Sequence, residues 1–200
     1  MVDQKASQPR TIGIVLFDDV EVLDFAGPYE VLSGARDDQG QACLRILTVA
    51  ARPEVRCRGG LRIVVDATLA ACPPLGAVVV PGGPGADVRT AEQTDHVIPF
   101  LRERAASAQL IASVCTGAFV LARAGLLAGR PATTHSKLRG ALRAEFPGLD
   151  VREEKVVDAG SVVTAAGVSS GIDLALYVLE RWFGPTVRAR SALDLDGAWL

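Results

Sequence analysis

The sequence has few of the residues that mark metal sites, disulfide frameworks or membrane spans. Its 200 residues include 2 histidines and 4 cysteines, and the cysteines lack the close pairing of a zinc site. No stretch approaches the roughly 18 consecutive apolar residues of a membrane helix, and the polar first ten residues lack the apolar core of a secretory signal. We therefore expect a cytoplasmic protein with no membrane partner, in which one or two cysteines at most carry chemistry.

An excess of positive charge is also missing. The 21 lysines and arginines are scattered and are balanced by 23 acidic residues, so a nucleic-acid partner is not expected. A content of 49% hydrophobic residues with a mean hydropathy of +0.27 is typical of a packed globular protein. The sequence predicts one domain over residues 11–200, preceded by a disordered tail over 1–10.

Short apolar runs alternate with longer amphipathic segments, which is typical of strands connected by helices. Gly59-Gly60 is expected to form a hairpin turn between neighbouring strands, and Pro99 is expected to bend or divide its helix. Ser169 or Ser170 is a candidate N-cap. Strands are expected at 12–17, 44–50, 61–65, 78–80, 110–114, 151–157 and 162–164, and helices at 23–33, 90–107, 119–124 and 169–182.

This alternation predicts an α/β fold, a flavodoxin-like three-layer sandwich with a mainly parallel central sheet. In such sheets ligands bind beyond the carboxyl ends of the strands. The loops after Phe17, Val80 and Val114 are therefore the expected site.

Cys115 directly follows the apolar run 110–114 and precedes the small residues Thr116, Gly117 and Ala118. This is the spacing of a nucleophile elbow with cysteine in place of serine. A thiol at a helix N-terminus is expected to have a lowered pKa and to react near neutral pH. The alternative is a small buried hydrophobe, the interpretation that we give to Cys43, Cys57 and Cys72.

The segment 81–85, Pro-Gly-Gly-Pro-Gly, follows a predicted strand and leaves backbone N–H groups uncovered. Gly83 is the candidate donor of an oxyanion hole, and the backbone of Thr116 is a second candidate. The spacing differs from the GxGxxG of nucleotide-binding loops, and an ordinary tight turn is the competing interpretation.

Asp24 and His135 are the other candidate site residues. Asp24 lies in the apolar run 22–26, where burial would raise its pKa and suit it as a proton donor, although a helix N-cap is an equal alternative. Glu30 is expected on the surface. His135 could approach Cys115, whereas His96 lies in a polar stretch and is expected to be exposed.

Five segments together resemble the ThiJ/PfpI superfamily, and within it the isonitrile hydratase branch and the ligand domain of AraC-type regulators. They are LDFAGPYEVL (23–32), VPGGPG (80–85), SVCTGA (113–118), AGLLAGRPATTH (124–135) and AGVSSGID (166–173). The protease-like and chaperone-like branches have histidine after the cysteine, whereas this sequence has Thr116. Ser136 stands where the hydratase branch tends to have an aromatic residue.

The resemblance implies that Cys115, Asp24 and Thr116 form an active site that adds water to an isonitrile, a lyase reaction, without metal or organic cofactor. It also implies a homodimer. A glyoxalase or deglycase that acts on small dicarbonyls, with the same cysteine, is the alternative enzyme. A small-molecule or redox sensing domain is the alternative without catalysis, although the sequence has none of the helix-turn-helix units of the regulators, which favours the enzyme.

Overall fold

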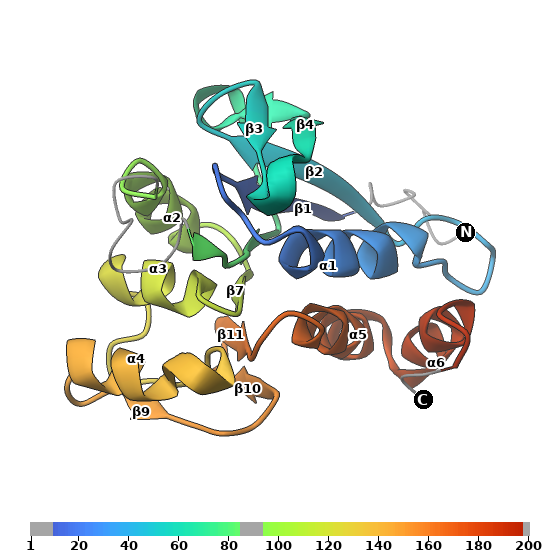
Figure 1. Ribbon diagram of the computed structural model, residues 1–200. Helices are drawn as coiled ribbons and strands as arrows, with labels where there is room; N and C mark the ends of the chain where they lie inside the picture. The colour runs from blue at the N-terminus through green and yellow to red at the C-terminus, as the bar shows by residue number, and fades with distance from the viewer. Residues whose placement is uncertain (1–9, 85–93, 198–200) are drawn as a thin grey trace.

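The computed structural model describes residues 10–84 and 94–197, and the predicted tail 1–9 lies outside them (Figure 1). Arg10, which the sequence assigns to the tail, is the first residue of β1. A seven-stranded sheet has the order β10-β11-β7-β6-β1-β2-β5, and every neighbouring pair is parallel except β10 with β11. Its strands are β1 (Arg10–Leu16), β2 (Leu44–Ala50), β5 (Ala67–Thr68), β6 (Ala77–Val80), β7 (Leu110–Val114), β10 (Val156–Asp158) and β11 (Val162–Ala165).

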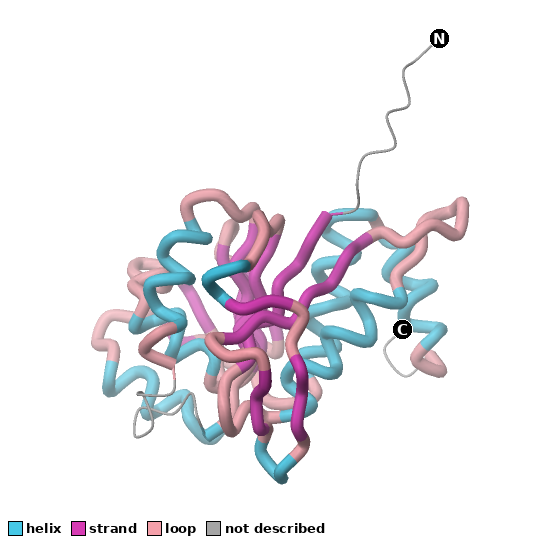
Figure 2. Tube along the Cα trace, turned by 90° about the horizontal axis from the view of Figure 1, so that it is seen from above, coloured by secondary structure: helices cyan, strands magenta, loops and turns pink. Residues whose placement is uncertain are grey.

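Helices flank the sheet on both sides, as Figure 2 shows from above. In Figure 1, α1, α5 and α6 lie on one side and α2, α3 and α4 on the other. The three-layer α/β architecture that the sequence predicts is therefore present. The helices are α1 (Val22–Gly34), α2 (Val97–Ala105), α3 (Gly117–Arg123), α4 (Arg139–Glu145), α5 (Ser170–Phe183) and α6 (Pro185–Asp194).

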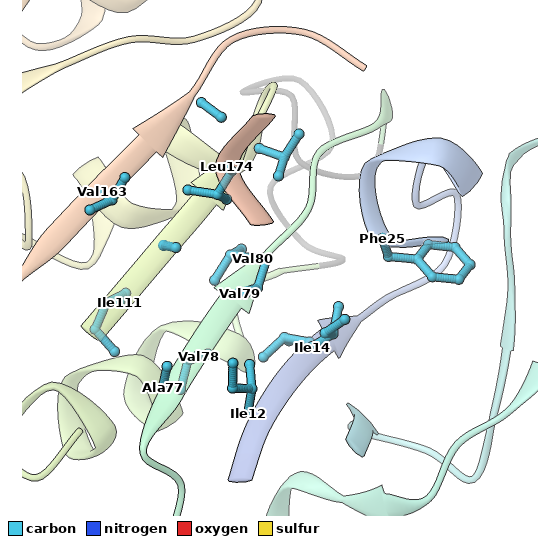
Figure 3. Packing of buried hydrophobic residues seen from close by; sticks show 14 of the residues in the cluster. Ile12, Ile14, Phe25, Ala77, Val78, Val79, Val80, Ile111, Val163 and Leu174 are labelled. Carbon is cyan, nitrogen blue, oxygen red and sulfur yellow. The ribbon is translucent and has the colours of Figure 1, made fainter. Parts of the chain in front are cut away.

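The central strands are buried because both faces of the sheet are covered. All residues of β6 and β7 are buried, and all of them except Ser113 are apolar, as is typical of strands covered on both faces. Figure 3 shows how side chains of β1, β6 and β7, among them Ile14, Val79 and Ile111, pack with Leu174 of α5 in one cluster. This core holds the carboxyl ends of β1, β6 and β7 rigidly side by side.

Two strand predictions differ from the structure, one in its pairing and one in its extent. Gly59-Gly60 does form a turn, but the turn joins β4 (Arg62–Val64) to β3 (Glu54–Arg56) in a separate hairpin and does not join β4 to β2. The predicted strand 151–157 is divided. Its first residue belongs to β9 (Asp150–Val151), which pairs with β8 (Pro131–Ala132), and its end belongs to β10.

Pro99 neither bends nor divides a helix. It is the third residue of α2, in the first turn, where a missing N–H costs no hydrogen bond. Residues 90–93 of the predicted helix lie outside the described residues. Ser169 occupies the N-cap position of α5 but makes no side-chain capping bond. Helices α4 and α6 have no counterpart among the predicted helices.

Candidate functional site

Cys115 lies at the sharp turn from β7 to α3. Its backbone has a φ of 57°, the left-handed region that residues other than glycine rarely adopt. Its N–H donates to the carbonyl oxygens of Ala165 (3.1 Å) and Ala166 (2.7 Å), and its own carbonyl accepts a 2.8 Å bond from the hydroxyl of Thr134. These contacts hold the strained turn, and strain maintained in this way is typical of functional sites.

Gly117 explains how the turn fits against the neighbouring strand. A Cβ at this position would lie 2.1 Å from the carbonyl oxygen of Val80, so only glycine allows α3 to start here. Gly117, one of the small residues after Cys115, therefore allows the close approach of α3 to β6.

Asp24 is the third residue of α1, where Glu21 occupies the N-cap position, so the N-cap interpretation of Asp24 is wrong. Its side chain is 0% exposed. Oδ2 accepts a 2.9 Å hydrogen bond from the N–H of Gly82, whereas Oδ1 has no hydrogen-bond partner among the described residues. A buried carboxyl group with one free oxygen is suited to carry a proton on that oxygen.

Burial raises the pKa of Asp24 from 3.8 to about 7, against the opposing effect of the Gly82 N–H, and the nearby charge of Glu21 raises it further. The raised pKa expected from the sequence is therefore confirmed. At neutral pH, close to that pKa, the protonated and ionised forms of Asp24 are both well populated.

The pKa of Cys115 moves in the direction opposite to the prediction. Burial, followed by the charge of Asp24, raises it to about 12, although the backbone N–H groups of Thr116 and Val168 favour the thiolate. The reason is that α3 is only seven residues long and the thiol is 6% exposed, so desolvation outweighs the helix N-terminus. The thiol of the free protein is protonated and must lose its proton within the site.

Thr116 and Gly83 bind each other. The N–H of Gly83 donates to Oγ1 of Thr116 (2.8 Å), and the hydroxyl donates to the carbonyl oxygen of Gly83 (3.0 Å). The N–H of Gly83 is therefore already bonded, and the prediction that it serves an oxyanion hole is wrong for this conformation. The backbone N–H groups that face the sulfur are those of Thr116 and Val168.

A pocket of about 440 Å³ opens above Cys115 and is lined by Gly83, Thr116, His135 and Val168, among others. Asp24 does not line this pocket but lies behind Gly82. A Cβ added to Gly82 would be 2.5 Å from Oγ1 of Thr116 and 2.9 Å from Oδ2 of Asp24, so Gly82 lies between these two side chains. The residues that the sequence singled out therefore meet at one place.

His135 lies at the wall of this pocket, as expected. Its Nδ1 accepts a 3.3 Å bond from the N–H of Lys137, and the structure gives it no hydrogen bond to Cys115 within the described part of the chain. His96 is exposed and lines a different pocket, which it shares with Phe17 and Asp18.

Cys43, Cys57 and Cys72 are free and buried in the core, which confirms the structural interpretation of these three residues. Within the described residues 10–84 and 94–197, no group of three or more His, Cys, Asp or Glu side chains could hold a metal ion. No helix in these ranges is both long and apolar enough to cross a membrane.

The site includes four residues that the sequence did not single out: Val168, Thr134, Glu21 and Arg58. Val168 has a φ of 41°, which is unusual for a β-branched residue, and its N–H faces the sulfur. Both Val168 and Thr134 belong to the segments that resemble the superfamily, which was the only available signal. Glu21 and Arg58 line the pocket entrance, and no pattern in the sequence pointed to them.

Comparison with known proteins gives consistent results. Residues 10–181 match the model of the DJ-1/PfpI family. The chain is 35% identical over 187 residues to isonitrile hydratase of Pseudomonas putida, covering 94% of this chain and 78% of that protein. It is 29% identical to an HTH-type transcriptional regulator of Pseudomonas aeruginosa, covering 90% of this chain but only 49% of the regulator.

Solved structures have the same fold. A ThiJ/PfpI family protein from Pseudomonas syringae superposes with a TM-score of 0.80 at 29% identity, covering 95% of this chain and 76% of that one. Toxoplasma gondii DJ-1 gives a TM-score of 0.77 at 22% identity, covering 93% of this chain and 97% of that one.

Proposed function

Because the chain belongs to the DJ-1/PfpI family, we propose that it is an enzyme that adds water to an isonitrile and releases an N-substituted formamide. The observation that carries the proposal is the placement of the fully buried Asp24 carboxyl group beside the Cys115 thiol, with Oδ1 lacking a hydrogen-bond partner among the described residues. Burial raises the pKa of this carboxyl group to about 7. The 35% identity to isonitrile hydratase supports the choice of substrate.

In the first step the sulfur of Cys115 forms a bond to the terminal carbon of the isonitrile. The thiol proton passes to the carboxylate of Asp24, and the carboxyl group delivers a proton to the carbon, which becomes strongly basic as sulfur attacks. Oδ1 is the oxygen suited to this transfer, because Oδ2 is bonded to the N–H of Gly82. The product is a thioimidate, and Asp24 returns to its starting state.

In the second step water adds to the thioimidate carbon. One proton of the water goes to the imine nitrogen, the carbon–sulfur bond breaks as the carbonyl forms, and the hydroxyl proton returns to the departing sulfur. The N–H groups of Thr116 and Val168 favour negative charge on that sulfur, so they assist its departure. The hydroxyl of Thr116 holds Gly83 in place, which makes it a positioning group.

Turnover of one alkyl and one aryl isonitrile, followed by mass spectrometry of the formamide, tests the proposal. Cys115→Ala and Asp24→Asn should each lower formamide production by about 10²–10⁴-fold, the usual range for a positioned acid or base and a lower bound for the nucleophile. Cys72→Ala is the matched control, since Cys72 is buried away from the pocket and should retain activity. If the native protein makes no formamide from either substrate, the proposal fails.

A small-molecule sensing domain is the second candidate, and its support is the 29% identity to an HTH-type regulator, of which the chain spans about half the length. The same pocket would then bind a ligand without turning it over. Ligand-induced stabilisation without product formation, with isonitriles or with the small dicarbonyls of the glyoxalase alternative, would favour sensing.

A further inference from the structure

Charged side chains stand at the entrance of the Cys115 pocket, where the proposed chemistry has no use for them. Arg58, from the turn of the β3–β4 hairpin, and Lys137, which follows β8, line the entrance together with Glu21. Nonpolar groups of Pro84, Leu138 and Val168 line other parts of the wall. The entrance therefore combines two cations, one carboxylate and an apolar surface.

The charges at the entrance do not cancel. Nη1 of Arg58 lies 2.5 Å from Oε2 of Glu21, and the side chains are 62% and 23% exposed. For Lys137 the structure gives no side-chain partner within residues 10–84 and 94–197. A guanidinium carries five N–H donors, and Glu21 uses one of them. Among the charged side chains that line the pocket, two cations and one carboxylate leave a surplus of one positive charge.

The backbone fixes Arg58 relative to the reacting groups. The N–H of Arg58 donates to the carbonyl oxygen of Val20 (3.0 Å), and the N–H of Glu21 donates to the carbonyl oxygen of Gly82 (2.9 Å). The hairpin turn is thus joined to the start of α1, and α1 to the loop that holds Asp24 and Thr116. Figure 1 shows the hairpin above the first turn of α1.

We infer that the entrance selects substrates that carry one carboxylate at the end remote from the reacting carbon, held by Lys137 and the free N–H groups of Arg58. The substrate class is then a short aliphatic isonitrile with a terminal carboxylate. The isonitrile group in this inference rests on the proposed function, whereas the carboxylate does not. One surplus positive charge matches a monoanion, and the planar guanidinium fits a carboxylate in two-point contact. The apolar wall suits the short chain between the two ends.

The alkylation of Cys115 tests the charge preference without any turnover. Iodoacetate and iodoacetamide are nearly equal in size and differ by one negative charge. At one cysteine, the ratio of the iodoacetate rate to the iodoacetamide rate does not depend on the thiolate fraction, because both rates are proportional to it. We expect this ratio to be higher at Cys115 than at Cys43 or Cys72 in the same protein, and to fall as salt is added. Arg58→Gln and Lys137→Gln should each lower it roughly two- to fivefold, the effect of one exposed charge.

Arg62→Gln is the matched control, because Arg62 belongs to the same hairpin but does not line the pocket and pairs with Glu54. It should leave the ratio unchanged. A ratio at Cys115 that is the same in the native protein, Arg58→Gln and Lys137→Gln would overturn the inference.

Turnover then separates this inference from the proposed function. We expect kcat/KM for an isocyano carboxylate to exceed that for its methyl ester, and the advantage to shrink in Lys137→Gln. If both compounds are hydrated equally well, the carboxylate preference is wrong and the hydratase stands. If neither is hydrated, the hydratase fails, and the alkylation ratio alone decides whether the entrance prefers anions.

Discussion

The hydroxyl of Thr116 is bonded to Gly83 twice, as an acceptor from its N–H at 2.8 Å and as a donor to its carbonyl oxygen at 3.0 Å. Gly83 is buried and has a φ of 132°, and a Cβ at this position would lie 2.5 Å from the carbonyl oxygen of Asp19. Thr116 thus satisfies both backbone groups of a residue that has to be glycine. It couples the elbow to the loop after β6.

Thr116→Val keeps the shape of the side chain and removes both bonds. Because the N–H and carbonyl of Gly83 would be left buried without partners, we expect the free energy of unfolding to fall by about 2–4 kcal/mol. Formamide production should also fall, but less than in Asp24→Asn. Urea denaturation measures the first effect, and Thr116→Ser, which keeps the hydroxyl, should restore most of it.

Asp24 should make stability depend on pH. The pKa of Asp24 is 3.8 in the unfolded chain and about 7 in the folded protein. The stability that the protonated carboxyl group contributes is therefore fully present below pH 3.8 and is lost as the pH rises through about 7. One pKa unit corresponds to about 1.4 kcal/mol, so between pH 5 and pH 8 the free energy of unfolding should fall by about 2–3 kcal/mol through this group. Urea denaturation at both pH values should show this loss in the native protein and not in Asp24→Asn. Equal losses in both proteins would mean that the pKa of Asp24 is not raised.

Asp24 should also suppress the reactivity of Cys115. The ionised carboxylate helps to raise the pKa of the thiol to about 12, so Asp24→Asn should increase the rate of alkylation by iodoacetamide at pH 8, about tenfold for each pKa unit removed. Peptide mass spectrometry follows the four cysteines separately, and Cys43, Cys57 and Cys72 serve as internal controls. An unchanged rate at Cys115 would show that the two groups are not coupled.

Gly82→Ala should damage the site directly. The added Cβ would lie 2.5 Å from the backbone nitrogen of Thr116 and 2.9 Å from Oδ2 of Asp24, so the loop has to move and the N–H of Gly82 can no longer bond Asp24 as it does now. We expect formamide production to fall at least tenfold. Gly140→Ala is the control, since nothing lies within 4 Å of its Cβ and alanine favours a helix. Comparable activity losses in both variants would contradict this account.

The homodimer that the resemblance implies remains a prediction. Large apolar side chains are exposed on the hairpin and at the start of α1, namely Val64 at 77%, Leu61 at 48% and Leu23 at 42%. Burying them would favour association. Sedimentation equilibrium should give twice the chain mass of 21.0 kDa, and Val64→Glu should shift the protein toward the monomer. A monomer at micromolar concentration would contradict the prediction.

The sequence alone determined those features that depend on neighbouring residues. Strands β2 and β7 have the predicted bounds because each is a largely apolar run set off by polar or small residues. The turn at Cys115 followed from small residues directly after a strand, and the burial of Asp24 from its apolar neighbours. Local composition is sufficient to predict these features because an apolar segment has to be buried in the core, whatever the rest of the chain does.

Only the tertiary structure decided features that depend on distances between remote segments. Strand β3 exists because it pairs with β4, and its three residues have no recognisable pattern of their own. The pKa of Cys115 is raised by burial of the thiol and by the charge of Asp24, which together outweigh the nearby N–H groups. Neither the depth of burial nor the distance to Asp24 can be read from the sequence. The pairing of Arg58 with Glu21 joins residues 37 positions apart through a hairpin whose turn the sequence predicted but whose first strand, β3, it did not. Electrostatic effects of this kind follow from packing, because the strength of a charge interaction is set by distance and by the exclusion of water.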